Sequence, residues 1–126
     1  MNIQDCSADD RVVLIVEDEA TLAFLIQSVM EEVGISALIF GSAEDALAIL
    51  RQEEYKFQLV LADVNLAGEM SGIGLSVILA CEFPDLPVIL MSAAPQIDVP
   101  AERLFLRKPI GIDQLINAVK SNMLGK

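Results

Sequence analysis

The chain has 126 residues, of which 54% are hydrophobic, so its length fits one domain with a buried core and its composition excludes a disordered chain. Nineteen acidic against eight basic residues give a formal net charge of −11, and such a surface repels phosphate backbones and anionic lipid, which argues against direct binding to nucleic acid or membranes. No apolar stretch approaches the roughly 20 residues that span a bilayer, and the N-terminus lacks the pattern of a secretory signal, so we expect a cytoplasmic protein.

The first half of the chain alternates short apolar runs with amphipathic stretches. VVLIV, residues 12–16, is a continuous, largely β-branched run, which is typical of a strand buried on both faces. Residues 19–34 carry apolar side chains at helical spacing, and Gly34 favours a stop at the end of that helix. Residues 35–40 predict a second strand, and Ser42 is a natural N-cap for the helix that follows it.

The same alternation continues in the second half. The expected elements are a strand at 57–63, a helix at 74–83, a strand at 87–92, a strand at 103–108 and a closing helix at 112–124. Residues 93–102 break the regularity, because Pro95 and Pro100 leave little room for a full helix between the last two strands. We therefore expect a short fourth helix or a loop there.

This alternation predicts an α/β fold with a doubly wound parallel sheet covered by helices on both faces. No repeat, low-complexity tract or linker divides the chain, so residues 1–126 are expected to form one domain with a tail at 1–9. The two cysteines are Cys6 in the tail and Cys81 in an apolar helical stretch. We expect both to be reduced and Cys81 to be a buried small hydrophobic residue.

Polar side chains stand where the predicted strands end. Glu17 and Asp18 follow the first strand, Asp63 ends the third, Ser92 ends the fourth and Lys108 ends the fifth. In an open parallel sheet the carboxyl ends of the strands lie along one edge, where ligands of such folds bind. These side chains are therefore expected to converge on one crevice.

Three carboxylates in one crevice need a counter-charge, because two unit charges about 4 Å apart repel by roughly 4 kcal/mol at an effective dielectric constant near 20. A proton or a cation must relieve that repulsion. The chain has no histidine, and carboxylate oxygens favour a hard ion such as Mg²⁺ over zinc. The Ser92 hydroxyl and the Lys108 ammonium suit phosphate oxygens. The set predicts phosphoryl transfer to Asp63 as nucleophile, with Mg²⁺ and Lys108 neutralising the transferred group and Ser92 donating a hydrogen bond to it.

Four segments, in this order, resemble the receiver domain of two-component response regulators over about residues 10–124. They are VLIVEDE with the acidic pair, VLADVNL with the acceptor aspartate, PVILMSA with the hydroxyl residue and LRKP with the lysine. The resemblance implies a flavodoxin-like sheet of five strands in the order 2-1-3-4-5. It also implies that a sensor histidine kinase or a phosphotransfer protein donates the phosphoryl group.

The resemblance further implies a magnesium site and a switch. Mg²⁺ would be bound directly by Asp18 and Asp63, through water by Glu17, and by the main-chain carbonyl of Asn65. In the family the hydroxyl residue shifts toward the phosphoryl group and an aromatic residue swings inward, which couples the site to a partner surface. In this chain those two residues are Ser92 and Phe105, and the resemblance also implies a cis peptide bond between Lys108 and Pro109.

The chain departs from the family pattern at two places. Lys108 follows Ser92 by only 16 positions, about six fewer than expected, which again indicates a shortened fourth helix or a loop and puts the usual output face in doubt. Ala67 replaces a proline that often follows the acceptor aspartate, and Gly68 supplies flexibility in that turn.

The individual residues also allow simpler interpretations. Glu17 and Asp18 could cap the first helix, Ser92 could be an ordinary strand-end hydroxyl, Lys108 an ordinary surface charge and Phe105 a core aromatic residue.

Two other functions remain open. A haloacid-dehalogenase-like phosphatase would use a similar nucleophile, but it places a second aspartate where this chain has Asn65. A degenerate receiver would serve only as a docking surface. The leading interpretation is a signalling domain that is not an enzyme beyond its own phosphorylation and dephosphorylation. No output domain is expected after the last helix, so the protein stands alone or was cut from a longer polypeptide.

Overall fold

A five-stranded parallel sheet forms the centre of the computed structural model, which describes residues 12–53, 56–93 and 104–123. The strands lie in the order β2-β1-β3-β4-β5, as the resemblance implied. Their bounds are β1 (Val12–Val16), β2 (Ser36–Phe40), β3 (Leu59–Asp63), β4 (Val88–Ser92) and β5 (Leu104–Arg107). All four pairings between neighbouring strands are parallel. The predicted flavodoxin-like fold is therefore confirmed.

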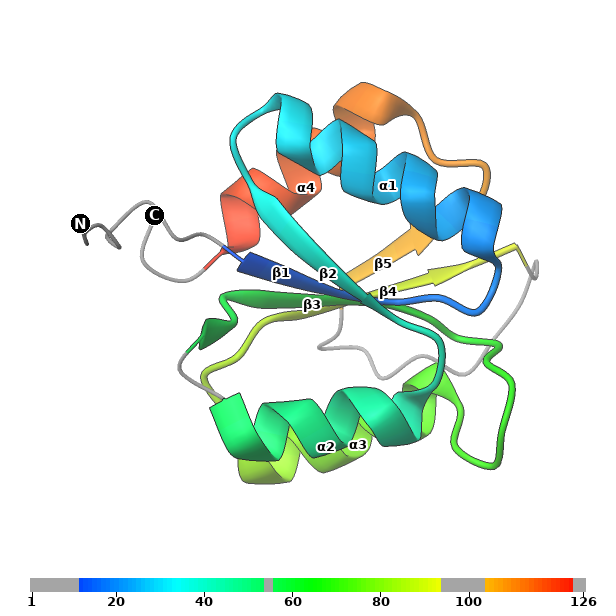
Figure 1. Ribbon diagram of the computed structural model, residues 1–126, viewed down its shortest axis with the longest axis vertical. Helices are drawn as coiled ribbons and strands as arrows, with labels where there is room; N and C mark the ends of the chain where they lie inside the picture. Colours follow the sequence, from blue (N-terminus) through cyan, green and yellow to red (C-terminus); the bar gives the residue numbers. More distant parts are fainter. Residues whose placement is uncertain (1–11, 54–55, 94–103, 124–126) are drawn as a thin grey trace.

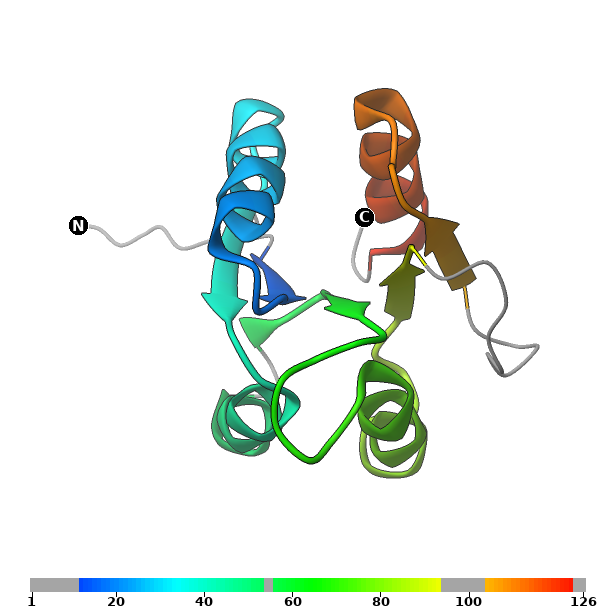
Figure 2. The ribbon, with the colours of Figure 1, turned by 90° about the vertical axis from the view of Figure 1, so that its right-hand side faces the viewer.

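In the described part of the chain, two helices lie on each face of the sheet, and Figures 1 and 2 show this arrangement. α1 (Ala20–Glu32) and α4 (Ile112–Asn122) lie on one face, and α2 (Ala43–Glu53) and α3 (Gly72–Glu82) lie on the other. β1 and β3 are buried along their whole length. Their side chains alternate between two core clusters, so that Ile15 packs on the α1 side and Leu14 packs on the α2 side. This explains why the sequence of β1 is apolar without interruption.

Local signals in the sequence set the helix ends. The Ser42 hydroxyl accepts a hydrogen bond from the backbone N–H of Asp45 at 3.1 Å, which confirms the predicted N-cap of α2. Gly34 follows α1 with a φ of +83°, a conformation that glycine adopts without strain, and its N–H donates to the carbonyl oxygen of Glu31 at 3.1 Å. The prediction for Cys81 is wrong, because this residue of α3 is exposed.

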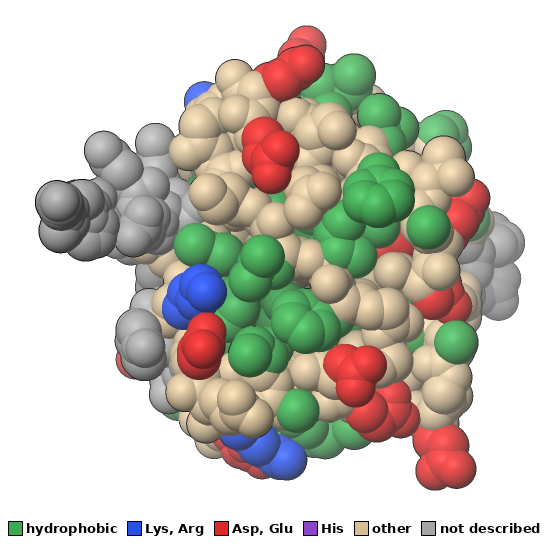
Figure 3. All heavy atoms as spheres, in the orientation of Figure 1, with side chains coloured by type: hydrophobic (Ala, Val, Ile, Leu, Met, Phe, Trp, Pro, Cys, Tyr) green, Lys and Arg blue, Asp and Glu red, His purple; other side chains and the backbone are tan. Residues whose placement is uncertain are grey.

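Several expectations fall on residues outside the described ranges. They are the tail at 1–9 with Cys6, and the short helix or loop at 94–102. On the face shown in Figure 3, acidic side chains are scattered over the surface, and few basic ones lie among them. In the described part of the chain, every helix is too short or too polar to cross a bilayer.

Candidate functional site

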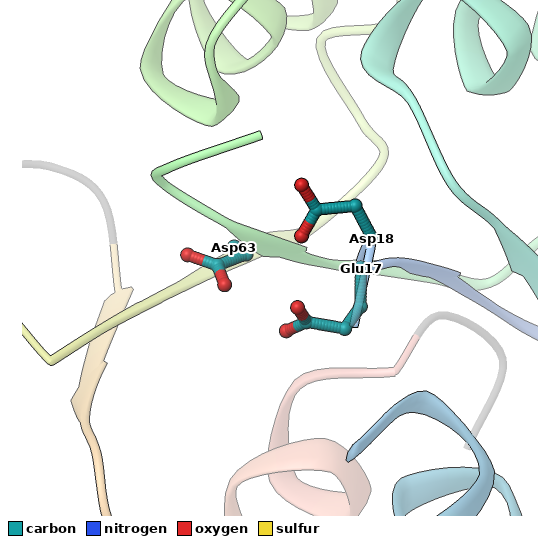
Figure 4. Close-up of side chains that lie close together, drawn as sticks. All are labelled: Glu17, Asp18 and Asp63. Atoms are coloured by element: carbon teal, nitrogen blue, oxygen red, sulfur yellow. The ribbon is translucent and has the colours of Figure 1, made fainter. Parts of the chain in front are cut away.

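Three carboxylates meet at the carboxyl ends of β1 and β3. Glu17 and Asp18 directly follow β1, and Asp63 is the last residue of β3. The pairing of Val16 with Ala62 places these two strand ends side by side. One oxygen from each of the three carboxylates lies within 4.8 Å of the others. Figure 4 shows these three side chains close together. The predicted convergence of the acidic residues is therefore present.

Burial distinguishes the three acids. Glu17 is 2% exposed and Asp63 is 6% exposed, whereas Asp18 is open to solvent. Burial is the main cause that raises the pKa of Glu17 above its ordinary value. The N–H of Glu19, which donates to Glu17 Oε2 at 3.1 Å, opposes this rise in pKa, and the negative charge of Asp63 adds to it. Three ionised carboxylates at this site are thus unfavourable unless positive charge compensates them.

Lys108 supplies positive charge to this site. Its Nζ lies 2.6 Å from Asp63 Oδ2 and 3.2 Å from Glu17 Oε1. Burial alone would lower the pKa of Lys108, but the hydrogen bonds to Asp63 and Glu17 and their charges together raise it above its ordinary value. The side chain therefore remains an ammonium ion. β5 brings it there, because the N–H of Lys108 continues the sheet by donating to the carbonyl oxygen of Ser92 at 2.9 Å.

The chain turns sharply on each side of the site. The peptide bond between Lys108 and Pro109 is cis, as the resemblance implied. After Asp63, the backbone folds back so that the N–H of Asn65 donates to Asp63 Oδ1 at 2.9 Å. The N–H of Ala67 then donates to Asp18 Oδ2 at 2.9 Å. Residues 64–71, which we call the acceptor loop, thus contact two of the three acids.

Glu44 of α2 also contacts the acceptor loop, which the sequence did not predict. Its Oε2 accepts hydrogen bonds from the N–H of Glu69 at 3.2 Å and from that of Met70 at 3.0 Å. In the sequence, Glu44 carries only the signal of an acid in the first turn of a helix, which the helix dipole explains. No local pattern predicts a side-chain contact with a backbone segment 25 residues away.

Ser92 and Phe105 lie on the two strands that complete this side of the sheet. Ser92 ends β4 and is fully buried, one residue beyond the Met91 that pairs with Asp63. Phe105 pairs with Leu90 and packs, partly buried, against the core cluster on the α2 and α3 side. The packing of Phe105 is that of a core aromatic residue, and its switch role stays a prediction.

The donor set fits a hard cation. Carboxylate oxygens that lie close together and are partly open to solvent through Asp18 are ligands that Mg²⁺ accepts. A carboxylate such as that of Asp63 can act as a nucleophile. If an anionic group were attached to it, the ammonium group of Lys108 would already be in place to compensate the added negative charge. The arrangement therefore suits the transfer of an anionic group to Asp63.

Comparisons with known proteins point in one direction. A family model described as "Response regulator receiver domain" matches residues 13–120. The response regulator protein FleR of Pseudomonas aeruginosa is 33% identical over 120 residues, which cover 90% of this chain and 25% of that protein. The transcriptional regulatory protein ZraR of Salmonella typhimurium is 30% identical over 109 residues, which cover 82% of this chain and 24% of that protein. The chain spans about a quarter of the length of these relatives.

A solved structure shows the same fold. It is a response regulator receiver domain protein from Clostridium thermocellum, with a TM-score of 0.80 and 21% sequence identity. The match covers 89% of this chain and 93% of that one. At this identity the likeness concerns the fold alone.

Proposed function

The chain belongs to the response regulator receiver domain family, and from this membership we propose that Asp63 is its phosphoacceptor. Signalling through a phosphoacceptor is the general role of the family, and the assignment to particular residues is the proposal. The observation that carries it is the position of Asp63. Its carboxylate accepts a hydrogen bond from Lys108 Nζ at 2.6 Å and lies beside two further acids at the carboxyl ends of the strands.

The donor is a phosphohistidine on a sensor histidine kinase or a phosphotransfer protein. One carboxylate oxygen of Asp63 attacks phosphorus, and the bond between phosphorus and the imidazole nitrogen breaks. The imidazole keeps the electron pair of that bond, and an acyl phosphate forms on Asp63. Lys108 already lies against Asp63, so its ammonium group is in place to neutralise the phosphoryl oxygens.

Glu17, Asp18, Asp63 and the main-chain carbonyl of Asn65 would hold Mg²⁺. When bound, the ion supplies positive charge to the transferred phosphoryl group. The Ser92 hydroxyl would donate a hydrogen bond to that group, and Phe105 would change its packing as a partner surface switches. These roles follow the family pattern at matching positions, and the partner that reads the switch is a protein of unknown identity.

The acidic surface argues against direct nucleic-acid binding by this domain alone. Because one relative is named a transcriptional regulatory protein, family membership does not support a general exclusion of nucleic acid. We limit the proposal to this domain: with a net charge of −11, its own surface does not bind DNA directly.

The test is incubation with a small phosphodonor and Mg²⁺, followed by intact mass measurement. The wild type is expected to gain one phosphoryl group only when Mg²⁺ is present, and Asp63→Asn is expected to gain none. Asp85→Asn, which changes an exposed acid outside the site, is the matched control and should be labelled like the wild type.

Other outcomes would assign a different function. Equal labelling of the wild type and Asp63→Asn would exclude Asp63 as the acceptor. No labelling of either protein would favour a receiver that serves only as a docking surface. Repeated turnover of a generic phosphate ester would favour a phosphatase.

A further inference from the structure

The acceptor loop, residues 64–71, leads from Asp63 to α3, and hydrogen bonds fasten it at its base, in its first half and in its outer half. At its base, the N–H of Gly72 donates to the carbonyl oxygen of Val64 at 2.9 Å. In its first half, Asn65 and Ala67 donate to the carboxylates of Asp63 and Asp18. The remaining anchor lies on the outer half of the loop and comes from a different element, α2.

That outer anchor is the carboxylate of Glu44. A single oxygen, Oε2, receives the N–H groups of two consecutive residues, Glu69 and Met70. Successive backbone N–H groups that point to one spot form an anion-binding concavity, and hydrogen bonds to an ionised acceptor are stronger than neutral ones. The other oxygen, Oε1, lies against Gly68, where an added Cβ would approach it to 3.1 Å. Gly68 turns with a φ of +96°, so the loop is shaped around this carboxylate.

The anchors differ in what a cation would do to them. Asp18 and Asp63 are proposed metal ligands, and a carboxylate that shares its charge with a cation is a weaker acceptor for the N–H of Ala67 or Asn65. Glu44 belongs to α2, is separate from the acid cluster, and keeps its full charge for the loop. Of the three carboxylates that hold the loop, Glu44 is thus the one whose hydrogen bonds a cation at the proposed site does not weaken.

We infer that Glu44 is a positioning residue for the metal site: it holds the acceptor loop in the arrangement that brings Asn65 beside Asp63 and Ala67 beside Asp18. This inference rests on the proposed Mg²⁺ site and adds a residue that positions the ligands of that site without binding the ion. Without the anchor, the loop adopts the binding arrangement for only part of the time, and the apparent dissociation constant rises in inverse proportion to that fraction. Saturating Mg²⁺ restores the arrangement, so affinity changes while the maximal rate of phosphorylation does not.

The experiment measures Mg²⁺ binding to the unphosphorylated full chain by calorimetry, together with amide hydrogen exchange at Glu69 and Met70. In Glu44→Ala we expect the dissociation constant to rise about fivefold, as a binding-competent fraction of about one fifth requires. Glu44→Asp keeps the charge but shortens the side chain, and should weaken binding similarly. Glu44→Gln keeps an oxygen acceptor at the same reach and should recover most of the affinity. Both amides should exchange faster in Glu44→Ala and Glu44→Asp even without Mg²⁺.

Asp45→Ala is the matched control, because it removes the same charge one position further along α2. It should bind Mg²⁺ like the wild type. Equal weakening in Asp45→Ala and Glu44→Ala would overturn the inference, because charge alone would then explain the loss. Unchanged affinity in both Glu44→Ala and Glu44→Asp would also overturn it. If Glu44→Ala does not fold, Glu44→Asp makes the same comparison. Absence of Mg²⁺ binding in the wild type would instead refute the proposed metal site itself, and with it this inference.

Discussion

At the scale of single residues, the site is a balance between Glu17, Asp63 and Lys108. Lys108 contacts both acids, but one ammonium group cannot compensate two buried carboxylates and the exposed Asp18. The raised pKa of Glu17 indicates that ionising this residue is the unfavourable step, because its charge is buried and lies near that of Asp63. A buried ionised acid lowers the stability of the fold without a cation, and it would serve the proposed binding of Mg²⁺.

The first prediction at this scale concerns Glu17→Gln. Because the pKa of Glu17 is raised in the folded state above its ordinary value of 4.5, the folded state binds the proton of Glu17 more tightly than the unfolded state does. The contribution of Glu17 to stability is therefore full below the ordinary pKa and is lost as pH rises through the folded pKa. Glu17→Gln removes this loss, so the metal-free variant should melt higher than the wild type near neutral pH, by about 3 °C. Thermal unfolding in a chelator, measured from about pH 4 to 8, tests it.

The pH dependence is the control for this prediction. The advantage of Glu17→Gln should grow as pH rises and should vanish below the ordinary pKa of glutamate, where both side chains are neutral. Added Mg²⁺ should stabilise the variant less than the wild type. A variant that melts lower than the wild type throughout this range would contradict the prediction. It would show that the ion pair between Glu17 and Lys108 stabilises the fold by more than the burial of the charge of Glu17 destabilises it.

Prediction from sequence succeeded for residues that the fold itself brings together. Glu17, Asp18, Asp63 and Lys108 were expected to converge because parallel strands place their carboxyl ends on one edge, and the structure agrees. Glu44 was missed because its contact depends on the path of the acceptor loop, which no periodicity encodes.

Cys81 was placed wrongly for a related reason. Its helix, α3, is apolar on nearly every side, with Val77 exposed and Leu79 buried, so the sequence offers no stripe that identifies the inner face.

At the scale of elements, the junction between β3 and α3 determines where Asp63 lies. α3 begins at Gly72, directly against the end of β3, and an added Cβ there would collide with the carbonyl oxygen of Asp63 and approach Val64 Cα to 2.9 Å. Two glycines in the first turn of a helix would normally weaken it. Glycine is required at position 72 because the backbone of Asp63 and Val64 occupies the space that a side chain would fill. Gly74 has ordinary space around it, since an added Cβ would lie 3.4 Å from Met70 Cγ.

This contrast gives a prediction with its own control. Gly72→Ala should destabilise the fold by about 3 kcal/mol, the cost of forcing extra volume into a packed region. It should also slow phosphorylation, because relief of the collision moves the backbone of Asp63. Gly74→Ala should stabilise the fold by up to about 1 kcal/mol, since alanine favours helix over glycine. Urea midpoints for the two variants test the pair. If both variants were equally stable, the close approach at Gly72 would be without consequence.

Element boundaries were predicted to within about two residues, and the errors have a physical origin. β1 matches its prediction residue for residue, because both neighbours pair with it along the run. The third strand was predicted to begin at 57, whereas β3 begins at Leu59. Phe57 is buried although it precedes β3. The apolar pattern in the sequence follows burial, and burial begins before the residues that pair with a neighbouring strand.

At the scale of the whole molecule, two kinds of electrostatic repulsion act on the same fold. The net charge of −11 spreads over the surface and opposes compaction in general. The three acids at the sheet edge oppose it locally, within 4.8 Å of one another. Monovalent salt screens exposed charges with a Debye length of about 10 Å at 0.1 M, and buried pairs much less. The two contributions can therefore be separated by the choice of ion.

Comparing NaCl with MgCl₂ at equal ionic strength gives the last prediction. Both salts should raise the melting temperature through general screening, but MgCl₂ should raise it further, because an ion that binds only the folded state stabilises it by RT ln(1 + [L]/Kd). At a Mg²⁺ concentration 100 times the dissociation constant, this excess is about 2.7 kcal/mol. In Asp18→Asn the excess should disappear, while the response to NaCl stays near that of the wild type because the net charge changes by one unit in eleven. An equal response of the wild type to both salts would mean that Mg²⁺ acts on this protein only by screening, and the carboxyl ends of β1 and β3 would then need another explanation for their three acids.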